Sequence, residues 1–211
     1  MTPGPILIKQ CKRCLKSFSE STLGSGNTFG ATFWTDGKIE GPMLPDTPDL
    51  VKCPHCGQFL WIAKASVVEE IDPFHSGDAW PDIPSYEELT EAEYLEALKM
   101  GIAKTKSQQI RTRICAWWKA NDPLRDSHSP EQTGHSAATV ENMRALFQLL
   151  AKEEGDYQRI TMAELARELG DFQAAQQILT ARFSDDKQDI VRKISELITK
   201  RDTRVASLEF D

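Results

Sequence analysis

The chain has 211 residues, of which 40% are hydrophobic and 27% are charged, a composition typical of a globular protein. The formal net charge of -7 is uneven: residues 1–64 carry seven Lys or Arg against five Asp or Glu, and residues 65–211 carry eighteen against twenty-seven. An acidic body argues against broad wrapping of a polyanion, and the lack of a long apolar run argues against a signal peptide or a membrane helix. We therefore expect a cytoplasmic protein with one small and one larger domain.

The first domain is expected at residues 9–66, after a loosely ordered lead at residues 1–8. Its residues favour turns and short strands rather than helices. The pattern predicts a strand, a tight turn, a returning strand, a Pro-rich loop and a last strand, at residues 28–35, Asp36-Gly37, 38–40, 41–49 and 59–62.

Residues 67–84 are predicted to be an ordered linker, because Pro73, Pro81 and Pro84 oppose regular structure while Phe74 and Trp80 would hold the segment against a neighbouring surface. A helical domain is expected at residues 85–205. Ser85 and Thr90 are both candidate N-caps, since each has a Glu three positions later. The apolar periodicity predicts helices at about residues 85–100, 106–120, 137–152, 160–169, 172–183 and 186–201.

Two short motifs carry most of the chemical information: Cys11-Lys12-Arg13-Cys14 and Cys53-Pro54-His55-Cys56-Gly57. Two cysteines three positions apart on a tight turn direct both sulfurs at one point. Two such turns supply four thiolates in a tetrahedron, about 2.3 Å from a zinc ion. Gly57 suits the turn because glycine adopts a left-handed backbone without strain, whereas Leu15 stands at the matching place of the first motif. In a reducing compartment, paired cysteines indicate a metal site before disulfides.

The Cys-Pro-His-Cys-Gly motif resembles the knuckle of the zinc-ribbon superfamily, a form shared with rubredoxins, over residues 9–64. The resemblance implies a β-hairpin ribbon with one structural zinc ion held by Cys11, Cys14, Cys53 and Cys56. Metal binding, worth about 10–16 kcal/mol in small fingers, would supply the folding energy of a unit with little core. Four protein ligands leave no open coordination position, so catalysis by this metal is not expected.

Three other interpretations of the cysteines stay open: two disulfides in an exported protein, an iron of the rubredoxin kind, and a redox-active pair. The long insert between the motifs departs from the compact rubredoxin design, and no thioredoxin-like context surrounds either pair. His55 is expected to be exposed rather than a ligand, and Cys115 to be a buried, inert thiol.

Residues 160–183 resemble one tetratricopeptide helix–turn–helix, through the turn Leu169-Gly170-Asp171-Phe172 and the small Ala175 that follows it. The related Gly155-Asp156-Tyr157 stands only fifteen residues earlier, which is not the repeat length of about 34 of that family. A compact helical bundle is therefore expected rather than a repeat array. The resemblance implies binding to another protein.

Basic and aromatic residues mark two candidate partner surfaces. Residues 99–119 hold six Lys or Arg and no acid, among them Arg111 and Arg113, and either contact nucleic acid or pair with the glutamates of the preceding helix. Trp34 is either an exposed anchor for a partner or packs on Trp61 inside the ribbon. Lys9, Lys12, Arg13 and Lys16 surround the first cysteine pair, where they would touch phosphates or offset the charge of a zinc thiolate centre.

Together these patterns predict an α+β protein, with an N-terminal four-cysteine zinc ribbon followed by an all-α helical bundle. The preferred function is a non-enzymatic adaptor that binds another protein, with no membrane and no small-molecule substrate. The alternative is a nucleic-acid-binding ribbon protein. A third hypothesis is an enzyme, or a second metal site, that uses Asp72, His75 and Asp78 of the linker.

Overall fold

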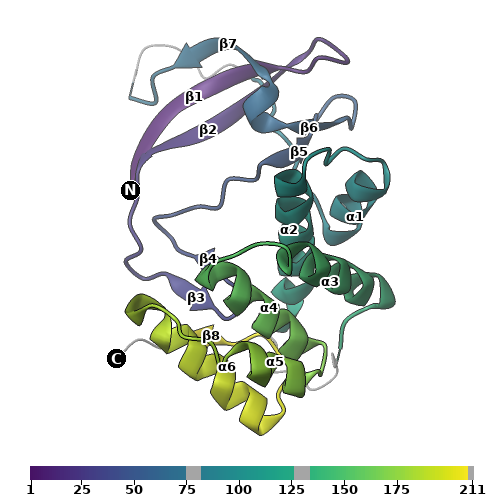
Figure 1. The fold of residues 1–211 in the computed structure, drawn as a ribbon. Helices are drawn as coiled ribbons and strands as arrows, with labels where there is room; N and C mark the ends of the chain where they lie inside the picture. Colours follow the sequence, from purple (N-terminus) through teal and green to yellow (C-terminus); the bar gives the residue numbers. More distant parts are fainter. Residues whose placement is uncertain (75–81, 126–133, 209–211) are drawn as a thin grey trace. The chain divides into compact units, whose positions relative to one another are not determined.

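The computed structural model describes residues 1–74, 82–125 and 134–208. It has strands in its N-terminal part and six helices after them, in agreement with a mixed α and β protein (Figure 1). The chain forms two compact units, Met1–Ala31 with Glu40–Leu89 and Thr32–Ile39 with Thr90–Asp211. None of the helices described combines the length and the apolar character that crossing a bilayer would need.

The first unit is built from short β-hairpins. Its elements are β1 (Thr2–Gln10), β2 (Ser17–Ser25), β5 (Leu50–Lys52), β6 (Phe59–Trp61), the 3-10 turn η1 (Ile62–Lys64) and β7 (Ser66–Ile71). β1 pairs antiparallel with β2 on one side and with β7 on the other, while β5 and β6 form a separate two-stranded ladder. The core of this unit contains the cysteines, with Phe18 fully buried among them and Leu60 and Tyr86 packed alongside.

Two expectations about this unit were wrong. Residues 1–8 are not a loose lead, because most of them belong to β1. The segment 67–84 is not free of regular structure either, because β7 occupies its beginning. All three prolines of that segment follow β7, so every β7 residue keeps the backbone N–H that the ladder with β1 needs.

The second unit is mainly helical. Its helices are α1 (Glu91–Lys99), α2 (Lys106–Arg125), α3 (Ala137–Leu150), α4 (Asp156–Glu168), α5 (Phe172–Ile178) and α6 (Gln188–Lys200), with a 3-10 turn η2 (Asp185–Lys187) before α6. Hydrophobic clusters among its described residues include one around Trp117 and Met143 and one around Ala163 and Ile194.

Local signals explain where the helices begin and end. Thr90 and Glu93 form the predicted capping box, so α1 begins after Thr90 and not after Ser85. Between α4 and α5, the N–H groups of Gly170 and Asp171 return to the carbonyls of Arg167 and Ala166, and Gly170 has φ +80°. This is a Schellman ending, and the Asp171 carboxylate then caps α5 through the Ala174 N–H.

The hairpin Thr32–Ile39 belongs to the second unit, although its place in the sequence predicts that it is part of the ribbon. Its strands β3 (Thr32–Trp34) and β4 (Ile39–Glu40) form a small sheet with β8 (Ser207–Leu208), in the order β4-β3-β8. Its turn residue Asp36 is buried and accepts hydrogen bonds from Arg125, at 3.2 and 2.5 Å, and from Asn121, at 2.9 Å.

These contacts also explain why α2 runs past its predicted end at residue 120. Asn121 and Arg125 hold Asp36, and Asp122 pairs with the Lys38 ammonium at 2.5 Å, so all three lie on the last helical turns and face the hairpin. Pro123 lies within this part of α2, where it removes one backbone donor. The tertiary contacts therefore outweigh the local signal to end the helix.

Candidate metal centre

Each cysteine motif forms the tip of its own hairpin. The first lies between β1 and β2, and the second between β5 and β6. The backbone follows the same course in both: the N–H of the leading cysteine reaches the carbonyl five residues on, from Cys11 to Lys16 and from Cys53 to Gln58. The residue after each second cysteine is left-handed, with φ +61° at Leu15 and +67° at Gly57. The two tips are therefore matching knuckles.

The four sulfurs converge. The Sγ atoms of Cys11, Cys14, Cys53 and Cys56 all lie within 4.8 Å of one another. Across the two knuckles, Cys11 is 3.8 Å from Cys56 and Cys14 is 3.7 Å from Cys53. Four sulfurs placed about 2.3 Å from a central ion in a regular tetrahedron lie about 3.8 Å apart. The set is thus spaced to hold a metal ion, and none of the five cysteines forms a disulfide.

Burial and hydrogen bonding shift the pKa values of the two most buried thiols in opposite directions. Burial by itself would raise the pKa of Cys11, but hydrogen bonds from the N–H groups of Cys14 and Arg13 and from the thiols of Cys53 and Cys14 together lower the pKa to about 7. Burial raises the pKa of Cys53 to about 12, against the amides of His55 and Cys56. Because metal ligands must be thiolates, a cation entering this set displaces protons from it.

No other candidate ligand among the described residues belongs to this cluster, and two candidates lie outside the described residues. His55 is exposed, as predicted, and its Nε2 lies 2.7 Å from the Ser17 carbonyl. Cys115 is buried in α2, also as predicted. In the linker, Asp72 accepts a hydrogen bond from the Phe74 N–H, and His75 and Asp78 lie outside the described residues.

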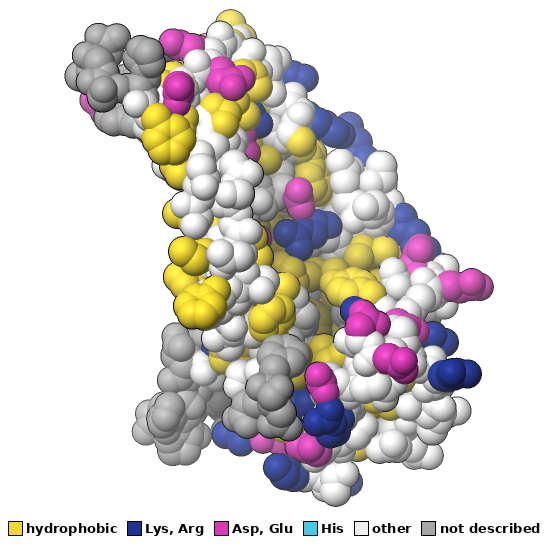
Figure 2. Space-filling model, turned by 90° about the vertical axis from the view of Figure 1, so that its left-hand side faces the viewer, with side chains coloured by type: hydrophobic (Ala, Val, Ile, Leu, Met, Phe, Trp, Pro, Cys, Tyr) yellow, Lys and Arg dark blue, Asp and Glu magenta, His cyan; other side chains and the backbone are white. Residues whose placement is uncertain are grey.

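The predicted partner residues are largely engaged inside the second unit. Arg113 donates to the Asn142 side chain at 3.0 Å and receives a bond on its own carbonyl in return, and burial lowers its pKa. Arg111 stacks over the Trp118 ring at 5.0 Å. Trp34 is half-buried, with the Arg125 guanidinium 4.8 Å from its ring centre. On the face drawn in Figure 2, basic and acidic side chains are both present.

The second unit contains a buried polar network that the sequence pattern does not predict. Glu168 is buried in α4 and accepts hydrogen bonds from Trp117, at 2.8 Å, and from Asn121, at 3.2 Å, while the His135 Nε2 lies 3.2 Å from it. Burial is the main reason that the pKa of Glu168 is raised to about 7. One signal was available: Glu164 and Glu168 continue the helical stripe that begins at the buried Ile160, so two acids occupy inward positions.

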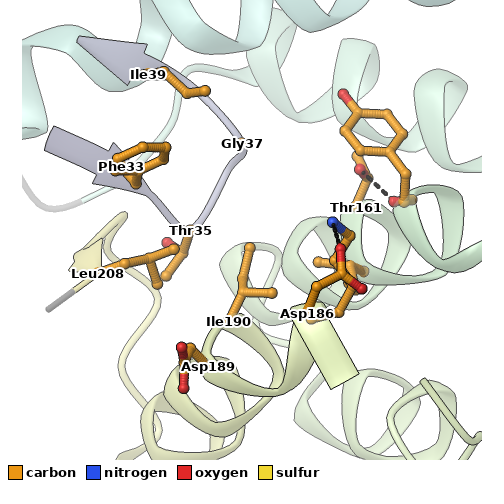
Figure 3. Close-up of a pocket in the computed structure, with 12 residues that line it drawn as sticks. Phe33, Thr35, Gly37, Ile39, Thr161, Asp186, Asp189, Ile190 and Leu208 are labelled. Carbon is orange, nitrogen blue, oxygen red and sulfur yellow. Dashed lines mark hydrogen bonds and ion pairs between the residues drawn. The ribbon is translucent and has the colours of Figure 1, made fainter. Parts of the chain in front are cut away.

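The second unit also contains an apolar pocket of about 520 Å³. Figure 3 shows Phe33 and Ile39 from the small sheet on one side, and Ile190 with Asp186 and Asp189 on the other. Two threonines in the wall have their hydroxyls engaged with backbone: Thr35 accepts from the Ala206 N–H, and Thr161 donates to the Tyr157 carbonyl. The wall is therefore apolar inside, and one rim carries two acids, Asp186 and Asp189, with the cation Lys187 between them in sequence.

Comparisons of the chain with protein-family models, with curated proteins and with solved structures gave no match.

Proposed function

We propose that this protein is a non-enzymatic protein-interaction module whose first unit is stabilised by one structural zinc ion. The observation that carries the metal part is the sulfur spacing of 3.7 and 3.8 Å across the two knuckles. Zinc is the ion we propose because it favours a closed tetrahedron of four thiolates, and such a closed site has no position for a substrate. The ion would join two hairpin tips that come from distant parts of the sequence.

The metal part is tested by elemental analysis of the freshly purified chain. We expect about one zinc per chain, and its loss when Cys53→Ser removes one of four ligands. Cys115→Ala is the matched control, because it removes the cysteine outside the cluster and should keep the metal. Iron in place of zinc, no metal at all, or equal metal loss in both variants would contradict the proposal.

The apolar pocket of Figure 3 is the proposed contact site for a protein partner. A pocket of this size and lining accepts a large apolar side chain. The rim acids Asp186 and Asp189 pair with Lys187 and Arg192 on the exposed surface, and such pairs are weak and screened by salt. A cationic residue beside the inserted side chain would compete for them, so we propose a partner segment with an apolar residue next to a Lys or Arg.

A pull-down with tagged chain tests this site through two matched variants. Ile39→Arg places a charge in the pocket wall, while Val68→Arg makes the same change at an exposed position of β7. A specific partner should be lost with Ile39→Arg and retained with Val68→Arg. Retention of every bound protein by Ile39→Arg would exclude the pocket as the contact site.

A further inference from the structure

A second pocket, of about 410 Å³, lies beside the cysteine cluster in the first unit. Three segments line it: the first knuckle, β6 with the residue before it, and the end of η1. Its residues are Gln10, Cys11, Lys12, Arg13, Gln58, Phe59, Leu60, Trp61, Lys64 and Ala65. This lining contains three cations, two aromatic rings and two amides, and it contains no carboxylate.

The cationic lining is not a consequence of composition. By sequence, the first unit carries six Lys or Arg against eleven Asp or Glu. Two of the six cations are held inside the unit: Lys9 is buried and pairs with Glu20 at 2.5 Å, and Lys52 pairs with Glu87 at 3.5 Å. The other four are exposed, and three of these line the pocket. Positive charge is thus concentrated at this one place in an acidic unit.

The two aromatic rings that line the pocket come from the same strand. Phe59 and Trp61 are two positions apart in β6, so they lie on the same face of the strand, about 7 Å apart along it. Both side chains are only partly buried. Leu60 points to the opposite face and packs with the cysteine core. The strand therefore presents two rings to the pocket while its alternate residue anchors it.

We infer that this pocket binds a nucleotide, with its base stacked on the Trp61 or Phe59 ring and its phosphate held by Lys64, Lys12 and Arg13. Aromatic faces with adjacent cations bind unpaired bases of any sequence, and the pocket has the size of a small-ligand site. The Gln58 side chain accepts a hydrogen bond from Arg13 at 3.3 Å, which links the guanidinium to the residue before Phe59. The inference extends the proposed function, because the metal is proposed to stabilise the unit that carries the pocket.

The test uses the full zinc-loaded chain and three probes: a fluorescent single-stranded oligonucleotide, the same sequence as a duplex, and a mononucleotide. We expect the single strand to bind more tightly than the duplex, because only unpaired bases can stack. Trp61→Leu should weaken binding about 5- to 150-fold, whereas Trp61→Phe should retain much of it. Lys64→Ala should lower the dependence of log affinity on log salt by about one ion.

Lys16→Ala is the matched control, since Lys16 is exposed near the same knuckle but does not line the pocket. Binding of the mononucleotide as well would identify a free nucleotide as the ligand, and binding of the oligonucleotide alone would identify a single strand. No binding of either, a duplex bound as tightly as the single strand, or equal losses for Lys16→Ala and Lys64→Ala would overturn the inference. Zinc content measured on each variant separates these outcomes from failure of the metal site.

Discussion

At the scale of single residues, the two knuckles differ at the position after the second cysteine. Both positions are left-handed, which costs a residue other than glycine about 1–2 kcal/mol. Leu15 is 67% exposed, so its side chain contributes little burial there. After allowing for the greater flexibility of an unfolded glycine, we expect Leu15→Gly to raise the free energy of unfolding by about 0.5–1 kcal/mol. Urea unfolding of the metal-loaded chain measures this.

The second knuckle provides the reciprocal control. A Cβ at Gly57 would meet no heavy atom within 4 Å, so Gly57→Ala introduces backbone strain without a clash. We expect it to lower the free energy of unfolding by about 1 kcal/mol. If neither variant changed stability, the left-handed turn would not limit the stability of either knuckle.

Glu168 gives a prediction about pH. Its pKa rises from 4.5 to about 7 on folding, mainly through burial, and the charges of Glu164 and Asp36 raise it further while His135 and Arg167 lower it. A carboxyl with a raised folded pKa binds more protons in the folded than in the unfolded state. Its stabilising contribution is therefore full below pH 4.5 and is lost as the pH rises to about 7.

Glu168→Gln isolates this effect, because the glutamine cannot ionise and its carbonyl can still accept from Trp117. We expect wild-type stability, relative to the variant, to fall with rising pH between 4.5 and about 7 and to level off above that range. Urea unfolding of both proteins, followed by far-ultraviolet circular dichroism over this range, gives the difference. Parallel curves for the two proteins would show that Glu168 has the same pKa folded and unfolded.

At the scale of secondary-structure elements, the hairpin Thr32–Ile39 is held by an ion pair whose side chains are almost fully buried, Asp36 at 0% and Arg125 at 2% exposure. Removing one partner leaves the other charge buried without compensation, at a cost of about 3–5 kcal/mol. We therefore expect Arg125→Leu to destabilise the second unit by that amount. The double variant Asp36→Asn with Arg125→Leu should lose less than the sum of the single changes. Additive losses in this double-mutant cycle would mean that the pair is not coupled.

The same elements show what a sequence alone can predict. The capping box at Thr90, the turn at Gly170 and the two cysteine knuckles are local, because their residues bond to one another within a few positions. The place of the Asp36-Gly37 turn in the fold is not set locally. The side chains that bind Asp36, Asn121 and Arg125, lie more than eighty residues away in α2. The Asp-Gly pair therefore indicates a hairpin correctly without indicating which unit receives it.

The strands of the first unit also depend on partners that are distant in the sequence. β1 begins with Thr2-Pro3-Gly4-Pro5, which carries turn residues; this start of the strand pairs with β2, and β7 adds a second partner from Ile6 onward. Register shifts near Pro3 accommodate these residues in the ladder. The cluster of four sulfurs was predictable because motif spacing encodes it. The second pocket beside it was not, because Lys64 joins the first knuckle only through the fold.

At the scale of the whole molecule, all four cysteines of the cluster belong to the first unit and make up much of its core, whereas Cys115 of the second unit lies outside the cluster. Removal of the proposed metal by a chelator should therefore unfold the first unit and leave the second folded. Hydrogen exchange should report this as lost protection in β1, β2, β5 and β6 with protection kept in α2, α3 and α4.

The variant Cys53→Ser is the control for this experiment, because a chelator should change nothing further in a chain that has already lost the site. The helical circular dichroism signal should stay near its original value in both treatments, since every α-helix that the structure describes belongs to the second unit. Loss of protection in the helices together with the strands would contradict independent units. It would mean that metal binding stabilises the entire chain, so that its 10–16 kcal/mol (the approximate range for small fingers) would apply to global unfolding.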